Sequence, residues 1–353
     1  MRKGTSITTL IAGIIAAGCF LFFWLLYPYH NLLKEQMTLF LHSAEHFLSY
    51  LTKPAWLSSA AGDLLTQFYI YPAGGALLVT VSLLAEWFLF RRVFRKSGMR
   101  SLYSSLSALV PVIIEFLLHC GLHYPLSSTF STLIALVTLI AFMRLRSNSL
   151  YFWLAFPAAA MMYLLAGHGI ILFIAGWMII GILGRRRRWY SMALPALCSL
   201  ALPLLLRATF LLSPVQAYRY PVREPLTLSV DMTWKKILEL DYESQQQNWP
   251  RVLVLSRDYA LQNRIASYYT NLALSQTGLM GEWLFHFYQP GPAGLFLPAT
   301  QYSTPLMITF SNEAFFYLGD LNMAQHAAML GICLLYTSPS PRDRTRSRMP
   351  SSA

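Results

Sequence analysis

The sequence predicts an all-α protein: a polytopic helical membrane bundle of about seven transmembrane helices, followed by a helical repeat-like domain. Of the 353 residues, 56% are apolar and 12% are charged, whereas soluble domains carry about 25% charged residues. The apolar residues gather in long runs over the first 206 positions. After about residue 231, amphipathic helical periodicity replaces these runs, which indicates a second, water-exposed part.

A membrane-spanning helix needs about 20 mostly apolar residues. Seven segments fit, at about 7–26, 72–90, 104–122, 126–143, 150–166, 169–184 and 189–206. Short basic segments such as Arg91-Arg92, Arg144 and the run Arg185 to Arg188 all face the cytoplasm if the N-terminus does, as the positive-inside rule expects. We therefore expect residues 1–206 to lie in a membrane, with the lipid bilayer as partner and the C-terminal part outside the cytoplasm.

Several functions are disfavoured by the same pattern. A net charge of +12 would suit nucleic acid only if the basic residues formed one soluble patch, but they flank apolar runs, so no nucleic-acid partner is expected. The chain has no Walker A motif, no G-x-G-x-x-G after a strand, no G-x-S-x-G and no cysteine/histidine zinc spacing. No cofactor is identifiable, and no metal centre is predicted.

The loop 27–71 between the first two spans is predicted to lie outside the cytoplasm, with one or two helices in the outer interface. It carries a possible polar cluster of His30, His42, Glu45, His46 and Asp63. The stretch from His42 to His46 fits H-x-x-E-H, a zinc-peptidase pattern. The simpler interpretation, that these are polar-face residues of an interfacial helix, is favoured.

Glu115, His119 and His123 recur every fourth residue, so they are predicted to share one face of the third span, which Pro111 should kink. Intramembrane acids are costly and mark functional hypotheses, here a proton path or an outer polar pocket. A structural glutamate bonded to a neighbouring helix is the open alternative. Glu86, one turn from Arg91, is explained by a local ion pair.

Residues 207–332 are predicted to form an extracytoplasmic α-helical domain, with helices at about 231–246, 250–261 and 263–277. Gly278 should stop the third of these helices. Pro305 suits a first helical position, and Leu318-Gly319 should end that helix. The run from Leu318 to Ala324 resembles the middle of a tetratricopeptide repeat.

Residues 333–353 have a different character. Cys333-Leu-Leu-Tyr-Thr-Ser-Pro-Ser-Pro-Arg-Asp343 reads as the translation of a transposon-based sequencing adapter, and Ser347-Arg-Met-Pro-Ser-Ser-Ala353 reads as its flow-cell end. We predict an artefactual, disordered tail and a natural protein truncated near Ile332; a natural Ser/Pro/Arg-rich tail is the alternative.

The stretches Tyr27-Pro-Tyr-His30, Lys34-Glu-Gln36 and Asp63-Leu-Leu-Thr-Gln-Phe-Tyr69 resemble the opening of an uncharacterised family of multi-pass inner-membrane proteins from gut bacteria. That resemblance implies topology and origin but no reaction. The architecture is also similar to GT-C glycosyltransferases, which use polyprenyl-phosphate sugars. This similarity implies Glu35 as the catalytic acid, although the usual adjacent acidic pair is absent from the loop.

Three functions remain open from the sequence. The leading hypothesis is a multi-pass inner-membrane protein that presents a periplasmic helical-repeat domain to a protein, peptide or glycan. The second is a GT-C-like transferase acting on a polyprenyl-phosphate sugar at the outer face. The third is a proton-coupled transporter using Glu115, His119 and His123.

Overall fold

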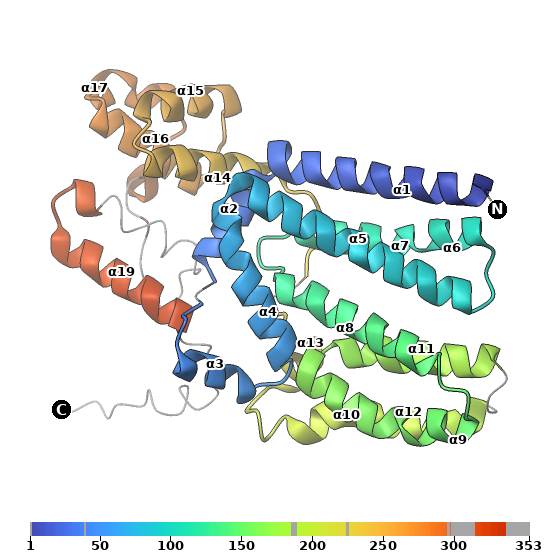
Figure 1. The fold of residues 1–353 in the computed structure, drawn as a ribbon. Coiled ribbons are helices and arrows are strands. Elements are labelled where there is room, and N and C mark those ends of the chain that lie inside the picture. Colours follow the sequence, from blue (N-terminus) through green and yellow to red (C-terminus); the bar gives the residue numbers. More distant parts are fainter. Residues whose placement is uncertain are drawn as a thin grey trace, which may run out of the picture. The chain divides into compact units, whose positions relative to one another are not determined.

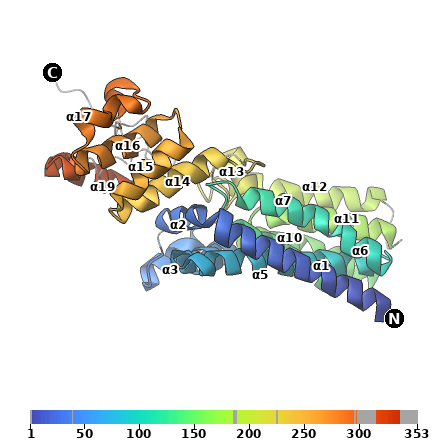
Figure 2. The same ribbon diagram turned by 90° about the horizontal axis from the view of Figure 1, so that it is seen from above.

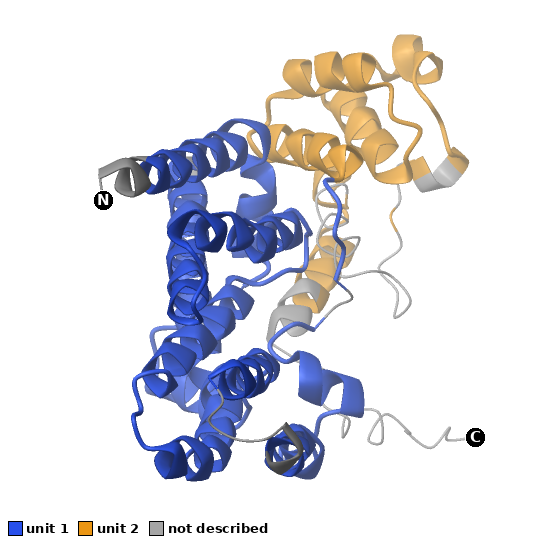
Figure 3. Cartoon of the chain, turned by 90° about the vertical axis from the view of Figure 1, so that its right-hand side faces the viewer, with its two compact units in different colours: residues 1–230, 340–353 blue, residues 231–339 orange. Residues whose placement is uncertain are grey.

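The computed structural model is all-helical over the residues it describes, which are 2–38, 40–184, 189–223, 226–294, 297 and 315–336. This confirms the all-α part of the predicted fold class for that part of the chain. The chain divides into two compact units, residues 1–230 with 340–353 and residues 231–339 (Figure 3). Unit 1 runs past residue 206, the predicted end of the membrane domain, and takes in a short helix, α13 (Pro214–Arg219).

Three helical stretches of unit 1 are long and apolar enough to cross a membrane. They are α1 (Arg2–Leu21) with the π-helical turn η1 (Phe22–Leu26), α5 (Pro72–Lys96), and α6 (Ser101–Ser107) joined to α7 (Leu109–His119). The third stretch is interrupted at Ala108, between α6 and α7 and one turn before Pro111. That is where the kink was expected, because proline cannot donate to the carbonyl four residues back.

The other predicted spans are also helical but shorter. They correspond to α8 (Leu126–Phe142), α9 (Asn148–Trp153) with α10 (Ala155–Ala166), α11 (Gly169–Leu183) and α12 (Trp189–Leu206). Figure 1 shows all these helices running alongside α1 and α5, and Figure 2 shows the same bundle from above. Within the described residues, then, all seven predicted segments form helices, of which three reach membrane-spanning length.

Three helices and a 3-10 turn occupy the loop between α1 and α5, where one or two helices were expected. They are α2 (Pro28–Gln36), α3 (Ala44–Leu51), α4 (Trp56–Thr66) and η2 (Gln67–Ile70). α3 buries none of its residues and exposes Phe47, Leu48 and Leu51, as an interfacial helix would. α4 differs, because Ser58, Ala60 and other residues of one face are buried in the bundle.

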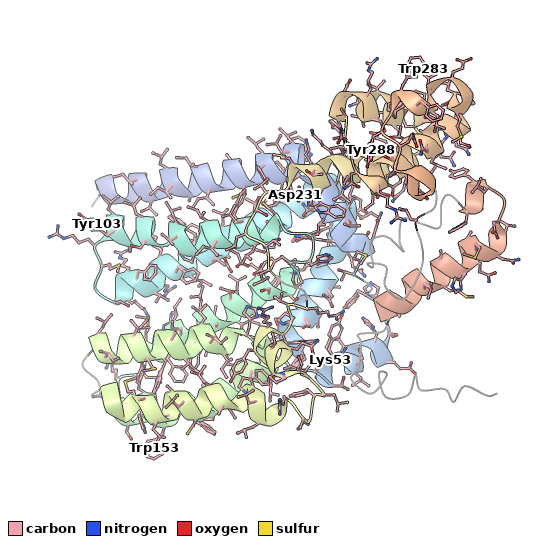
Figure 4. All side chains as sticks on the ribbon, turned by 180° about the vertical axis from the view of Figure 1, so that it is seen from behind. Lys53, Tyr103, Trp153, Asp231, Trp283 and Tyr288 are labelled. Carbon is pink, nitrogen blue, oxygen red and sulfur yellow. The ribbon has the colours of Figure 1, made fainter. Side chains whose placement is uncertain are left out.

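The bundle has two chemically different ends. Lys53, between α3 and α4, lies at one end, and Tyr103 and Trp153 lie at the other (Figure 4). The Tyr103 end also carries the basic C-terminal turn of α5, with Arg95 and Lys96. The run Arg185 to Arg188 lies outside the described residues.

Unit 1 combines an aromatic core with an apolar exterior. Tyr151 Oη donates to the Trp177 carbonyl at 2.6 Å, and Trp177 Nε1 returns a bond to the Tyr151 carbonyl at 3.1 Å. Large apolar side chains nevertheless cover the outside of the bundle, including Leu10, Val110, Leu194 and Leu205, which are 61–71% exposed. Such extensive apolar exposure is unusual for a surface in water.

Unit 2 is a cluster of short helices. Its described elements are α14 (Met232–Gln245), α15 (Trp249–Tyr259), α16 (Arg264–Gln276), α17 (Met280–Trp283), η3 (Leu284–His286), η4 (Gly291–Gly294) and α19 (Leu321–Tyr336). The first three agree with the predicted helices to within two residues at each end. α16 is the centre of the unit, since its residues from Ile265 to Leu274 are all buried.

Two glycines of unit 2 lie at helix ends, as the sequence predicted. Gly278 ends α16 with φ +74°, and Gly319 has φ +79°, a left-handed conformation that glycine adopts without strain. After Gly319, Asp320 Oδ1 accepts from the Met323 N–H at 3.1 Å and so caps α19. The predicted helix start at Pro305 lies outside the described residues, and the tetratricopeptide-like repeat stays a prediction.

Candidate functional site

α4 is docked tightly into one end of the bundle. At Gly62 a Cβ atom would lie 2.4 Å from the Ser127 backbone nitrogen, so the backbones of α4 and α8 are in direct contact. Ser131 Oγ of α8 donates to Ser58 Oγ at 3.0 Å. This docking fixes the position of Asp63, the residue after Gly62.

A distant segment is attached to the same end. The His168 N–H, in the turn between α10 and α11, donates to the Tyr220 carbonyl at 2.9 Å. Gly167, with φ +54°, allows this approach, because a Cβ there would lie 2.2 Å from the Tyr220 oxygen. The contact brings Arg223, three residues further on, to the end of the bundle that holds α3 and α4.

These segments form a polar group that we call the Asp63 site, consisting of His46, Tyr50, Lys53, Asp63 and Arg223. Tyr50 Oη donates to Asp63 Oδ2 at 2.9 Å and lies 3.3 Å from His46 Nε2. Arg223 and Lys53 interact electrostatically with the Asp63 carboxyl. One acid, two cations and the rings of His46 and Tyr50 therefore come together at this site. His46 and Arg223 are 177 residues apart in the sequence.

Burial changes the acid–base properties of this site. It raises the pKa of Asp63, while the Tyr50 hydrogen bond and the charges of Arg223, His46 and Lys53 lower it again. Burial also lowers the pKa of Lys53, with nearby Arg223 acting in the same direction. Asp63 is thus a carboxyl group whose proton affinity depends on its neighbours, a property common among catalytic acids and bases.

A second polar group, the Glu115 network, lies inside the bundle and consists of Lys34, Glu115, His119, Tyr124 and Thr129. Glu115 Oε1 accepts from Tyr124 Oη at 2.6 Å and from Thr129 Oγ1 at 2.8 Å. Thr129 Oγ1 also lies 2.8 Å from His119 Nε2. At the C-terminal end of α7, the buried Lys34 ammonium donates to the His119 carbonyl at 2.7 Å. Burial lowers the pKa of Lys34 to about 8.

Glu86 lies next to this network and is fully buried on α5. Neither of its carboxyl oxygens has a hydrogen-bond partner among the described residues. The ion pair expected with Arg91 is wrong, because the Arg91 guanidinium binds Ser105 Oγ at 2.9 Å and Thr8 Oγ1 at 3.1 Å instead. Glu86 does interact electrostatically with Glu115, so two buried carboxyl groups are close to one another.

The structure separates the residues that spacing had grouped together. His123 is exposed beyond the end of α7, whereas Glu115 and His119 are buried on that helix. His42 precedes Ser43, the N-cap of α3, and therefore does not share a helical turn with His46. His42 and Glu45 are both exposed.

The remaining predicted residues lie apart from the Asp63 site. His30 is buried and stacks on Tyr27 with ring centroids 3.9 Å apart. Glu35 is half-buried on α2, and burial raises its pKa. No hydrogen bond or ion pair to the Glu35 side chain is found in the described part of the chain. Its catalytic role stays a prediction.

Sequence reasoning missed the partners of these acids. Tyr50, Lys53 and Arg223 contribute to the Asp63 site, and Tyr124 and Thr129 to the Glu115 network, but none belongs to a motif. One signal was present: a tyrosine and a lysine follow His46 within the same loop. Among the described residues, no group of three or more His, Cys, Asp or Glu side chains could hold a metal ion.

The fold and these sites define the class as an all-helical protein with apolar helices long enough to cross a membrane and polar groups among them. Within that class, the chain belongs to a family of unknown function (DUF6057), which matches residues 3–346. No curated protein and no solved structure matches the chain. The matched range ends inside the segment 333–353, whose adapter origin stays a prediction.

Proposed function

We propose that the chain is a seven-span protein of the bacterial inner membrane, with its N-terminus in the cytoplasm and unit 2 in the periplasm. The exposed apolar exterior of unit 1 supports insertion into lipid. The basic residues at the Tyr103 end of the bundle support a cytoplasmic position for that end. The Asp63 site then opens on the periplasmic side.

The function that the geometry supports best is transfer of a sugar from a polyprenyl-phosphate donor at the outer face, as in GT-C-like glycosyltransferases. The observation that carries this proposal is the Asp63 carboxyl group held by Tyr50 at 2.9 Å beside Lys53 and Arg223. A transferase of this kind needs a base for the acceptor and cations for the phosphate leaving group. The Asp63 site offers both.

In the proposed reaction, Asp63 accepts the proton of an acceptor hydroxyl as the hydroxyl oxygen bonds to the anomeric carbon. The bond from that carbon to the phosphate oxygen breaks, and its electron pair stays with the polyprenyl phosphate. Lys53 and Arg223 balance the developing negative charge. Asp63, rather than Glu35, is the acid favoured by the geometry, because Lys53 and Arg223 surround Asp63.

The test uses the full chain in lipid nanodiscs with synthetic undecaprenyl-phosphate hexoses, measuring release of undecaprenyl phosphate. Asp63→Asn should lower the rate about 100-fold or more, since a general base contributes at least that much. Glu45→Gln, on the exposed face of α3, is the matched control and should leave the rate unchanged. Equal rates for Asp63→Asn and the wild type would show that Asp63 is not the general base. If only Glu35→Gln lost activity, Glu35 would be the catalytic carboxyl group instead.

The pH profile gives a second test of the same site. Asp63 must be ionised to act as a base, so the rate should rise with pH through its pKa, which burial raises. Tyr50→Phe removes a hydrogen bond that lowers this pKa. The acidic limb of the profile should therefore move to higher pH in Tyr50→Phe, and an unmoved limb would argue against Asp63 as the titrating base.

A second candidate function is binding of a glycan, peptide or protein by unit 2 through a helical-repeat domain. It is favoured by a cavity of about 510 Å³ within unit 2. The lining includes two aromatic rings and two amides, which suits stacking and hydrogen bonding to a sugar, and comprises Ser244, Gln245, Phe316, Tyr317, Leu321, Ala324, Gln325 and Ala328. Calorimetry of the full chain with cellohexaose and chitotetraose tests this function. A heat of binding that is seen in the wild type and is lost in Tyr317→Ala would support a glycan site in this cavity. No heat of binding in the wild type would exclude these glycans as ligands.

A further inference from the structure

The buried carboxyl pair in the bundle is not used by the transferase proposal. Glu86 is 0% exposed and Glu115 is 7% exposed, on the neighbouring helices α5 and α7. No described cation forms an ion pair with either side chain, and the lysine of the Glu115 network, Lys34, binds the His119 carbonyl. Two uncompensated carboxylates in one apolar core would repel each other and lose their hydration. One proton held by the pair removes the repulsion and leaves a single buried charge.

The hydrogen bonds distinguish the two carboxyl groups. Glu115 Oε1 receives hydrogen bonds from two hydroxyl groups, Tyr124 and Thr129, which stabilise a negative charge. Glu86 receives none. The proton therefore belongs on Glu86 and the charge on Glu115, which leaves one carboxylate and the Lys34 ammonium as opposite charges in the same part of the bundle.

The network also provides a route for exchange of this proton. The Thr129 hydroxyl has a single hydrogen, and that hydrogen points to Glu115. Its oxygen must then accept from His119 Nε2–H at 2.8 Å, which fixes the ring tautomer. The carbonyl of His119 accepts from Lys34 on α2, at the end of the bundle that holds Lys53. Exchangeable hydrogens thus link Glu115 through the Thr129 hydroxyl to the His119 ring, and the Lys34 bond to the backbone carbonyl fixes the end of α7 beside them.

From this arrangement we propose that Glu86 and Glu115 form a proton-binding site in the core of unit 1, which holds one proton and exchanges it by way of Thr129 and His119. The proton moves between oxygen and nitrogen atoms without any change of oxidation state. The titratable groups on the elements packed against α5 include Cys19, His30, Lys34, Glu35, Tyr69, Tyr103, Glu115 and His119. Two of these are carboxyl groups. Glu35 is half-buried, whereas Glu115 is 7% exposed, so Glu86 and Glu115 are the buried carboxyl pair that carboxyl spectroscopy can test.

The experiment is infrared difference spectroscopy of the full chain in nanodiscs, which detects the C=O stretch of a protonated carboxyl group. At pH 8, above the pKa of about 6 of the buried Asp241 in unit 2, the wild type should still show this band. Glu86→Gln should remove it, whereas Glu45→Gln and Asp63→Asn should not. A wild-type spectrum without the band, or a band that persists in Glu86→Gln, would overturn the proposal.

The route is tested by following the same band after transfer to D₂O. Deuteration shifts the C=O stretch, so the rate of the shift measures proton exchange at the pair. Thr129→Val keeps the shape of the side chain but removes the bridging hydroxyl, and it should slow the shift at least tenfold. Thr132→Val, on the same helix and bonded only within it, is the control. An unchanged rate in Thr129→Val would exclude the route.

Discussion

Helix α16 of unit 2 and helices α5 and α7 of unit 1 both bury polar side chains, but they satisfy them differently. On α16, Ser267 bonds the Tyr288 carbonyl and Thr270 bonds Ser256. Asn271 exchanges two hydrogen bonds with Gln289, at 2.8 and 2.9 Å, and also donates to the Gly294 carbonyl. On α5, by contrast, Glu86 is fully buried, and neither of its carboxyl oxygens has a hydrogen-bond partner in the described part of the chain.

This difference distinguishes buried polar residues that stabilise the fold from buried polar residues that serve a function. A buried polar group whose hydrogen bonds are all made stabilises one packing arrangement, whereas an unsatisfied one costs stability and persists for another reason. By this criterion the polar residues of α16 hold η4 and the segment at Gln289 in place. Glu86 has no such structural explanation, and the following changes test the distinction.

The largest effect is expected for Asn271→Ala. The substitution leaves Gln289 Oε1 and the Gly294 carbonyl without the donor that Asn271 supplies, so unit 2 should lose about 3 kcal/mol of unfolding free energy. Pulse proteolysis of the full chain in detergent, over a urea series, measures this loss. Gln276→Ala, an exposed position on the same helix, should stay within about 0.5 kcal/mol of the wild type. A small loss in Asn271→Ala would show that this network is not what orders unit 2.

Asp241→Asn should change how the stability of unit 2 depends on pH. Burial raises the pKa of Asp241 from 3.8 to about 6, although Tyr269 and Gln245 bond the carboxyl group. The folded state therefore binds the proton more tightly than the unfolded state. The contribution of Asp241 to the unfolding free energy of unit 2 is therefore greatest below pH 4. It falls by up to about 3 kcal/mol as the pH rises to 6 and beyond.

Because asparagine does not titrate, Asp241→Asn should remove that fall and be the more stable form at pH 8. The same urea series, repeated at pH 4, 6 and 8 for both proteins, measures the difference. A pH dependence equal in the two proteins would mean that Asp241 is ionised in the folded state without cost.

Gly62→Ala tests the docking of α4. The added methyl group would meet the Ser127 backbone at 2.4–2.5 Å, so α4 must move away from α8 at a cost of about 1–3 kcal/mol. Thermal unfolding in nanodiscs measures the cost. Gly98→Ala is no suitable control because of its positive φ, but Gly13→Ala on α1 meets nothing within 4 Å and should be neutral.

The smallest effect is expected for Glu86→Gln. If Glu86 holds a proton, the acid and the amide are both neutral and similar in shape, so the stability of unit 1 should change by less than about 1 kcal/mol. A loss as large as that of Asn271→Ala would place Glu86 in the structural group with α16 and remove the contrast between the two regions.

The sequence allowed prediction of features that depend on local spacing. Hydrophobic periodicity located the helices from α14 to α16, and a four-residue interval placed Glu115 and His119 on one helical face. The same interval failed for His123, because α7 ends before that residue is reached. Helical spacing gives correct neighbours only as far as the helix continues.

Contacts between distant segments could not be predicted in this way. Arg223 reaches Asp63 because the Tyr220 carbonyl binds the turn between α10 and α11, and no local pattern encodes that hydrogen bond. Arg91 likewise had an acid one turn away, yet it binds Thr8 of α1 and Ser105 of α6. A long side chain can bind any suitable partner within its reach, and the fold determines which partners those are.

The hydrogen bond from His168 to Tyr220 has a consequence for biosynthesis. Arg223 follows the apolar helices α1 to α12 of unit 1, so the ribosome makes it after Tyr50 and Asp63 have already left the exit tunnel. During translation, the segment from α3 to α4 is therefore complete before α12 and Arg223 are synthesised. A nascent chain arrested before residue 220 would thus contain Asp63 but not Arg223. The Asp63 site therefore stays incomplete until Arg223 has been synthesised.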